Sequence, residues 1–143
     1  DYFELESNRR GNHYDAFTEI DFSQYDDREG MKLVRPVAKR PMQFISGVRD
    51  GNWLVFNNMC FKQNPQKVTI ELQAETPGTV IEIREGSLDG KLIATCPINQ
   101  NQTPGEWEKQ AFEVSGAVKD KSKIYFLFRG QSQGLAIKNF VFY

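Results

Sequence analysis

Hydrophobic and polar residues alternate along much of the chain with a period of two, which is typical of strands that bury one face. The alternation is clearest in residues 67–74, where Val68, Ile70 and Leu72 share one side. No stretch shows the periodicity of an amphipathic helix of three turns or more. The pattern predicts an all-β fold, a β-sandwich or a jelly roll.

Residues 79–98, with the sequence TVIEIREGSLDGKLIATCPI, predict a β-hairpin. Apolar positions on either side would form the two strands, and residues 87–90 would form the turn. Asp89-Gly90 is a hairpin signal because glycine accepts a positive φ, so we expect Gly90 to supply that conformation.

Short strands separated by turns account for the rest of the chain, and residues 1–143 are expected to form a single domain. Further strands are expected at residues 1–6, 31–37, 42–48, 53–61, 107–114, 124–128 and 135–143. A bend is expected at Asn57-Asn58, and the nearly continuous apolar run 124–128 predicts a central strand. Residues 7–30 are polar but contain Phe17, Ile20 and Phe22, which indicates an ordered excursion with short elements of its own.

Composition narrows the function classes. The eleven phenylalanines predict an aromatic core. The net charge is −1 and acidic and basic residues are interspersed, so nothing indicates a surface that binds nucleic acid. No apolar run approaches the ~20 residues of a membrane span. We therefore expect a monomer that binds neither nucleic acid nor membrane. Cys60 and Cys96 lack zinc-ligand spacing and are expected as thiols, with a disulfide between them left open.

Catalytic signatures are missing from the sequence. His13 is the only histidine, and none of the nineteen acidic residues stands out as a pair for glycoside hydrolysis. A binding protein is therefore favoured over an enzyme. Trp107 follows the polar loop 99–106, where an exposed ring flanked by planar hydrogen-bonding groups would suit a sugar. The alternative is that Trp107 packs half-buried against the hairpin.

Several motifs together resemble family 6 of the carbohydrate-binding modules. They are the IEIREGSLDGKLIAT run, the D-G-N-W turn at residues 50–53, G-E-W at 105–107 and the closing I-K-N-F-V-F strand. The resemblance implies a non-catalytic, all-β jelly-roll β-sandwich of two antiparallel sheets that binds a plant or algal polysaccharide. It also implies that the module was excised from a secreted or periplasmic glycoside hydrolase, whose catalytic domain would be its partner.

The family's usual binding site combines a Tyr, a Trp in a G-x-W loop and an Asn before the last strand. Trp107 matches the loop Trp, but the Tyr position falls on Gly47, the Asn position near Ala136, and Asn52 stands where the family has Asp. Phe44, Arg49 or Tyr25 could form the opposing wall. The carbohydrate-binding candidates are Trp107, Phe44, Arg49, Asn52 and Tyr25.

These departures keep a second hypothesis open, in which the domain is an accessory sandwich with little sugar affinity, docked on a catalytic domain. An open Trp107 ring beside polar groups would favour sugar binding, and a covered ring would favour the accessory role.

Trp53 is expected to be structural, because it begins a strand and its family counterparts pack inside.

The resemblance also implies a structural calcium ion held by Glu4 and Glu6 and an Asp of the last strand. That Asp position falls on Lys138, which brings no oxygen ligand and adds a positive charge. We hypothesise that the Lys138 ammonium replaces the ion by pairing with Glu4 or Glu6. The alternative is that Lys138 points to solvent while calcium binds through other oxygens. No other cofactor is expected.

Overall fold

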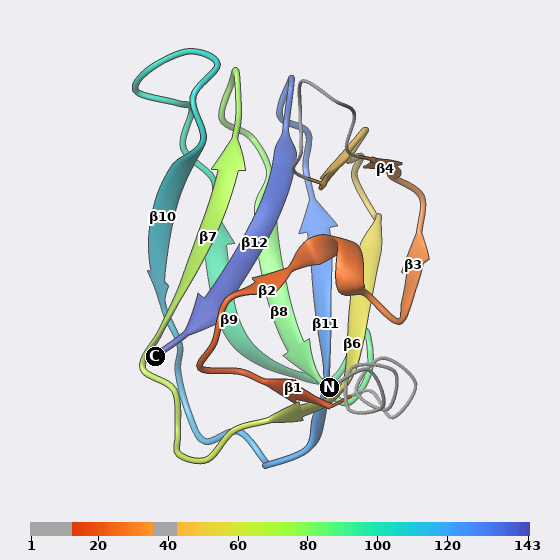
Figure 1. Ribbon diagram of the computed structural model, residues 1–143, viewed down its shortest axis with the longest axis vertical. Helices are drawn as coiled ribbons and strands as arrows, with labels where there is room; N and C mark the ends of the chain where they lie inside the picture. Colours follow the sequence, from red (N-terminus) through yellow and green to blue (C-terminus); the bar gives the residue numbers. More distant parts are fainter. Residues whose placement is uncertain (1–12, 36–42) are drawn as a thin grey trace.

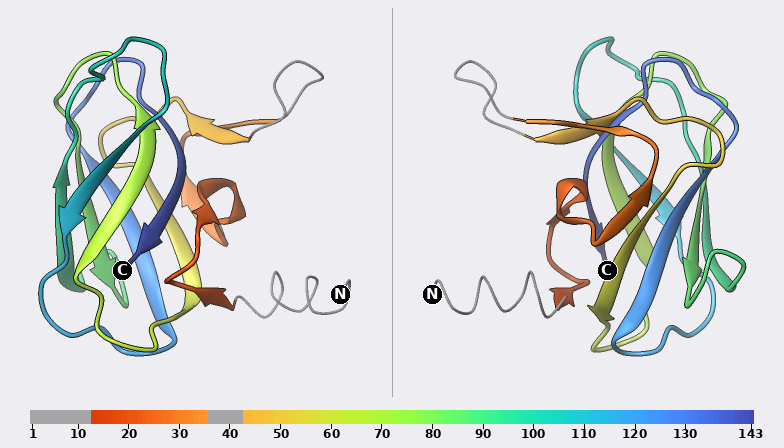
Figure 2. Two further views of the ribbon diagram at one scale, coloured as in Figure 1. Left: turned by 60° about the vertical axis from the view of Figure 1, so that its left-hand side comes forward. Right: turned by 90° about the vertical axis from the view of Figure 1, so that its right-hand side faces the viewer.

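The computed structural model describes residues 13–35 and 43–143, which form two facing β-sheets (Figures 1 and 2). Sheet A contains β1 (Tyr14–Asp15), β3 (Asp27–Glu29), β6 (Trp53–Cys60), β8 (Val80–Glu85), β9 (Lys91–Pro97) and β11 (Ser122–Arg129). Sheet B contains β2 (Ile20–Asp21), β4 (Lys32–Val34), β5 (Phe44–Ser46), β7 (Lys67–Gln73), β10 (Glu108–Glu113) and β12 (Ala136–Phe142). The predicted sandwich is confirmed.

Strand order follows β1-β6-β11-β8-β9 in sheet A, with β3 also on β6. In sheet B the order is β10-β7-β12-β5-β4, with β2 on β12. The apolar strand β11 is central, as predicted. One pairing departs from the expected antiparallel sheets: β1 runs parallel to β6.

Phenylalanine rings from both sheets fill the space between the layers. The fully buried rings are those of Phe22, Phe56, Phe126, Phe128, Phe140 and Phe142. Phe22 belongs to the 3-10 helix η1 (Phe22–Gln24), and its ring centroid lies 4.9 Å from that of Phe140. The segment before β3 is therefore anchored in the core by an aromatic contact, which is worth ~1 kcal/mol beyond the area it buries. The aromatic core and the short elements within residues 13–30 are confirmed.

The hairpin of β8 and β9 forms as predicted, but its glycines serve different purposes from those expected. Gly86, not Gly90, has the positive φ, at 92°. A Cβ at Gly90 would lie 2.1 Å from the Glu85 carbonyl oxygen, so Gly90 is required by close backbone approach. The expectation that Gly90 supplies a positive φ is therefore wrong.

Other details refine the sequence reading. The bend in β6 is present, because Asn58 has a φ of 51° and the β6–β11 register shifts between Ser122 and Ile124. Both cysteines are free thiols, and burial raises the pKa of the Cys96 thiol to about 12. The expected strand 1–6 lies outside the described residues.

Four loops gather at one end of the sandwich, at the top of Figure 1: residues 47–52, 74–79, 99–106 and 130–135. Hydrogen bonds join them. The Gly130 amide donates to Asp50 Oδ1 at 2.8 Å, and the Asn101 amide donates to the Ala74 carbonyl at 2.8 Å. Within the described residues, no helix has the length and hydropathy needed to cross a membrane.

Candidate functional site

Trp107 lies at the loop end of sheet B and is half-buried. Its ring meets that of Phe44, with centroids 5.1 Å apart and planes at 63°. Ile45 is fully buried and pairs with Ile137, so its neighbour Phe44 points to the outer face of the sheet. The two rings therefore form an apolar surface on the outside of sheet B, next to the loops.

Polar groups border this surface. Lys138 Nζ lies 5.7 Å from the Trp107 ring centroid and 3.8 Å from Glu71 Oε1. The side-chain Nδ2 of Asn139 donates to the same Glu71 oxygen at 2.8 Å. Lys138 lies where the β12–β7 register shifts, between Ile137 and Asn139. We call Trp107, Phe44, Lys138 and Glu71 the Trp107 cluster; it joins an accessible ring to an ammonium and a carboxylate that can bind hydroxyls.

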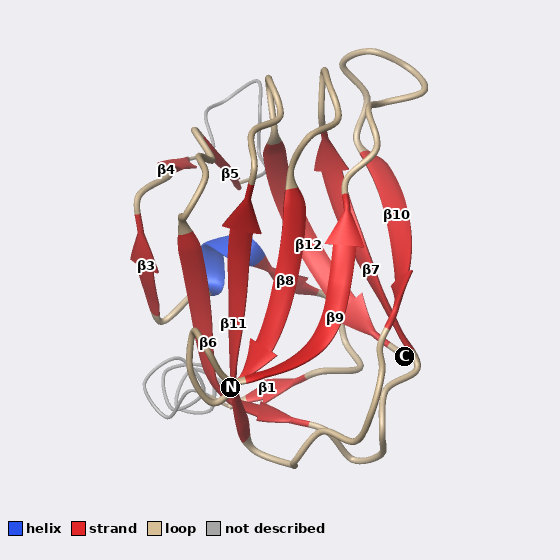
Figure 3. Cartoon of the chain, turned by 180° about the vertical axis from the view of Figure 1, so that it is seen from behind, coloured by secondary structure: helices blue, strands red, loops and turns tan. Residues whose placement is uncertain are grey.

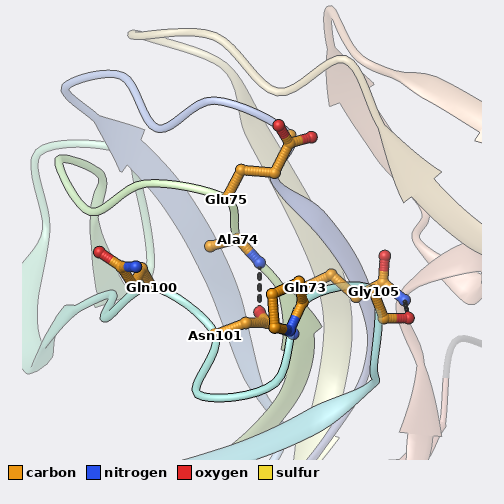
Figure 4. A pocket seen from close by; sticks show the side chains of 8 residues that line it. Gln73, Ala74, Glu75, Gln100, Asn101 and Gly105 are labelled. Atoms are coloured by element: carbon orange, nitrogen blue, oxygen red, sulfur yellow. Dashed lines mark hydrogen bonds between the residues drawn. The ribbon is translucent and has the colours of Figure 1, made fainter.

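A cavity of ≈ 330 Å³ opens beside the loop that carries Trp107 (Figure 4). Asn101 holds this loop: its Oδ1 accepts from the Ala74 amide at 2.7 Å, and its Nδ2 donates to the carbonyls of Thr103 and Glu106. Gln73 Nε2 donates to the Gly105 carbonyl at 2.9 Å. These bonds fix the position of Trp107 before any ligand arrives, which lowers the entropy cost of binding.

Arg49 and Asn52 lie in one turn at the same end. Asn52 Oδ1 accepts from the Arg49 amide at 2.8 Å, and the Asn52 side chain packs so closely that a Cβ at Gly30 would lie 2.3 Å from Asn52 Nδ2. Asn52 thus stabilises the turn. Arg49 lines a second cavity, of ≈ 400 Å³, together with Gly47 and other residues of the loops.

Tyr25 lies elsewhere. It lines a cavity of ≈ 560 Å³ with Asp21 and Arg35, and the Arg28 guanidinium lies 5.5 Å above its ring. The structure therefore brings Trp107 and Phe44 together and places Arg49 in a neighbouring groove. Tyr25 and Asn52 do not belong to the Trp107 cluster.

Sequence reasoning missed a second aromatic surface, on the outer face of sheet A (Figure 3 shows β6, β11 and β8 side by side). Trp53 and Tyr125 meet there with centroids 5.8 Å apart and planes at 63°. Val55 and Leu127 are each only 4% exposed and face the same way, since Leu54 points into the core. Trp53 therefore packs on the outside of the sheet rather than in the core. The alternation in residues 53–56 could have revealed this, because Leu54 and Phe56 are the core-facing positions.

Charged groups surround this second surface and pair mainly with one another. Arg84 Nη2 lies 3.0 Å from Glu82 Oε1, and Arg129 Nε lies 3.8 Å from the same oxygen. Arg84 also donates to the Gly90 carbonyl at 2.8 Å, and Lys123 Nζ lies 6.0 Å from the Tyr125 ring centroid. We call Trp53, Tyr125, Val55 and Leu127 the Trp53 face.

Of the residues implied as calcium ligands or standing at a ligand position, only Lys138 lies within the described part of the chain. Lys138 brings no oxygen ligand to that position, and its Nζ lies 3.8 Å from Glu71 Oε1. The described residues contain no group of three or more His, Cys, Asp or Glu side chains that could hold a metal ion. Glu4 and Glu6 lie outside the described residues, so their expected pairing with Lys138 stays a prediction.

Comparisons of the sequence and of the structure with known proteins point to the same family. The sequence model for the carbohydrate binding module (family 6) matches residues 23–143. A family 6 module from Clostridium cellulolyticum in complex with xylose is 25% identical, with a TM-score of 0.79 over 90% of this chain and 98% of that one. A β-1,3-glucan-binding family 6 module from Bacillus halodurans is 21% identical, with a TM-score of 0.80 over 91% and 98%.

One curated relative is an enzyme, the arabinoxylan arabinofuranohydrolase of Bacillus subtilis (strain 168). It is 29% identical over 92 residues, which are 64% of this chain. The match spans only 18% of the enzyme's length, so the likeness is to a small part of a multidomain glycoside hydrolase.

Proposed function

The chain belongs to family 6 of the carbohydrate-binding modules, and from this premise we propose that it binds a polysaccharide at the Trp107 cluster. The observation that carries the proposal is the half-buried Trp107 ring, met edge-on by Phe44 and bordered by Lys138 and Glu71. The apolar C–H face of a sugar ring would stack on the indole, and its hydroxyls would bond to the ammonium and the carboxylate. The module performs no catalysis.

In the wider proposal, the module is part of a secreted or periplasmic glycoside hydrolase and directs it to plant or algal polysaccharide. The likeness to part of an arabinofuranohydrolase supports this assignment. Gly47 and Ala136 stand where side chains that contact sugar are expected, and this observation favours the alternative of an accessory sandwich with little affinity. Affinity should be weak in either case, because one ring and a few solvent-exposed hydrogen bonds leave little net free energy.

Affinity electrophoresis tests the proposal. Native gels containing xylan or β-1,3-glucan should retard the wild-type chain, and Trp107→Ala should restore the mobility seen without polysaccharide. Trp53→Ala is the matched control, because it removes an equal ring from the other sheet and should leave retardation intact. Far-UV circular dichroism checks that both variants are folded. Retardation of Trp107→Ala equal to wild type would move the site elsewhere, and no retardation of the wild type would favour the accessory role.

A further inference from the structure

The groove that Arg49 lines has an uneven charge. It measures ≈ 400 Å³ and lies between the loops 47–52 and 130–135. Arg49 is the only ionisable side chain among the described residues that line it. Its side chain is exposed and forms no ion pair with any described carboxylate. An arginine that lies beside a groove and has no ion-pair partner among the described residues is available to an anionic ligand group.

The walls of this groove are fixed by hydrogen bonds that leave the guanidinium free. The Asp50 carboxylate, next to Arg49 in the chain, accepts from the Gly130 amide at 2.8 Å. Gln131 Nε2 donates to the Val48 carbonyl at 3.0 Å, and its Oε1 accepts from the Asp50 amide at 3.3 Å. The two loops are thereby held together, so the ligand would meet a preorganised site.

Small residues keep the groove open at the positions nearest to Arg49. Gly47 has a φ of 67°, and a Cβ there would approach nothing closer than Lys32 Cβ at 3.8 Å. Lys32 pairs across the strands with Ser46, so a second basic residue lies on the strand next to this end of the groove. At the other end, Gly134 has the Glu75 carboxylate against it, where an added Cβ would be 2.2 Å from Glu75 Oε2. The groove is therefore positive at the Arg49 end and negative at the Glu75 end.

Gly134 also lines the cavity beside the Trp107 loop, so the two hollows adjoin. A chain stacked at the Trp107 cluster could place a further unit in the groove. We propose that the Arg49 end of this groove binds the carboxylate of a uronic acid residue, so that the module prefers acidic polysaccharides to neutral ones. This inference rests on the proposed function, since it names the substrate class of the same binding surface.

A matched pair of ligands tests the inference. One is a xylan carrying glucuronic acid branches, and the other is the same polymer after its carboxyls have been reduced to primary alcohols. Isothermal titration should give the wild-type chain about tenfold tighter binding to the acidic polymer, the size of a charge-assisted hydrogen-bonded pair. Added salt should weaken the acidic complex and leave the neutral one nearly unchanged.

Arg49→Gln should abolish the difference between the two polymers, and Arg49→Lys should retain part of it. Lys119→Gln makes the same change in net charge in the connection between β10 and β11, and should retain the full difference. That connection lies at the end of the sandwich opposite the four loops (Figure 1). Equal binding of both polymers by the wild type would overturn the inference while leaving the proposed function intact. Acidic preference that survives Arg49→Gln would also overturn it, and binding of neither polymer would count against both.

Discussion

The Trp107 cluster and the Trp53 face contain nearly the same aromatic contact in different surroundings. In each, a tryptophan meets a second ring with the planes at 63°, at 5.1 Å in the first and 5.8 Å in the second. Trp107 lies at the end of a loop, beside a cavity bordered by amide groups. Trp53 lies within a sheet, between β3 and β11, over the buried side chains of Val55 and Leu127.

This difference separates binding from packing. Trp53 pairs across the strands with Leu127, which is buried on the same outer face of the sheet, so removing the ring should expose apolar side chains to water. The Trp107 ring has Phe44 at one side and polar groups around it, so its accessible surface is available to a ligand. Half-burial and an aromatic neighbour are therefore insufficient to identify a sugar site. The surroundings of the ring distinguish the two roles: apolar side chains beside it indicate packing, and polar groups around it indicate a binding site.

The largest expected effect is on stability at the Trp53 face. Trp53→Ala should lower the free energy of unfolding by about 2 kcal/mol, because Val55 and Leu127 lose their cover. Trp107→Ala should lower it by less than about 1 kcal/mol, since the ring lies outside the core. Urea unfolding followed by circular dichroism measures both. A larger loss for Trp107→Ala would make Trp107 the packing residue and reverse the comparison.

The second effect is on affinity at the Trp107 cluster. Phe44→Ala removes the edge contact that positions the indole, which is worth ~1 kcal/mol, so affinity for polysaccharide should fall about fivefold. Tyr125→Ala removes the corresponding contact from Trp53 and should leave affinity unchanged. Isothermal titration with one xylan preparation compares the two variants. If Tyr125→Ala were the one to weaken binding, the Trp53 face would be the sugar site.

A smaller effect should appear at Asp21, close to Lys138. Burial raises the pKa of Asp21, Glu19 raises it further, and Lys138 opposes both. The folded chain thus holds this proton more tightly than the unfolded chain, so ionisation above the ordinary Asp pKa of about 3.9 lowers the free energy of unfolding. Asp21→Asn should remove that loss and raise the free energy of unfolding slightly at neutral pH, because solvent screens this exposed carboxylate, with little change below pH 4. Melting curves across pH check this, and a variant less stable at neutral pH would show that the Asp21 charge is stabilising.

The smallest expected effect is that of calcium. Lys138 occupies the implied ligand position, so melting midpoints with excess calcium and with chelator should be equal. Lys138→Asp supplies an oxygen at that position and is the variant in which a calcium-dependent midpoint is expected. A drop of several degrees for the wild type in chelator would establish a stabilising metal ion.

The sandwich and its core were predictable because alternation fixes which side of a strand is buried. Val68, Ile70 and Leu72 show this directly. The conformation of the turn was less predictable. The Asp89-Gly90 pair does not reveal whether the glycine is needed for a positive φ or for the close approach of another backbone atom. Trp107 and Phe44 are more than sixty positions apart in the sequence, and β7 and β12 lie between β10, which follows Trp107, and β5, which carries Phe44, so no sequence pattern reveals their contact. The outward face of β11 was hidden within an almost continuous apolar run.

The chain has two tryptophans, so its nitrogen–proton correlation spectrum contains two indole signals, which Trp53→Phe and Trp107→Phe would assign. Titration with a xylo-oligosaccharide and with a β-1,3-gluco-oligosaccharide then reports on each ring separately. Binding at the Trp107 cluster predicts that the Trp107 indole signal shifts with saturation while the Trp53 signal stays in place. A Trp53 signal that moves while that of Trp107 remains fixed would contradict the assignment of the site.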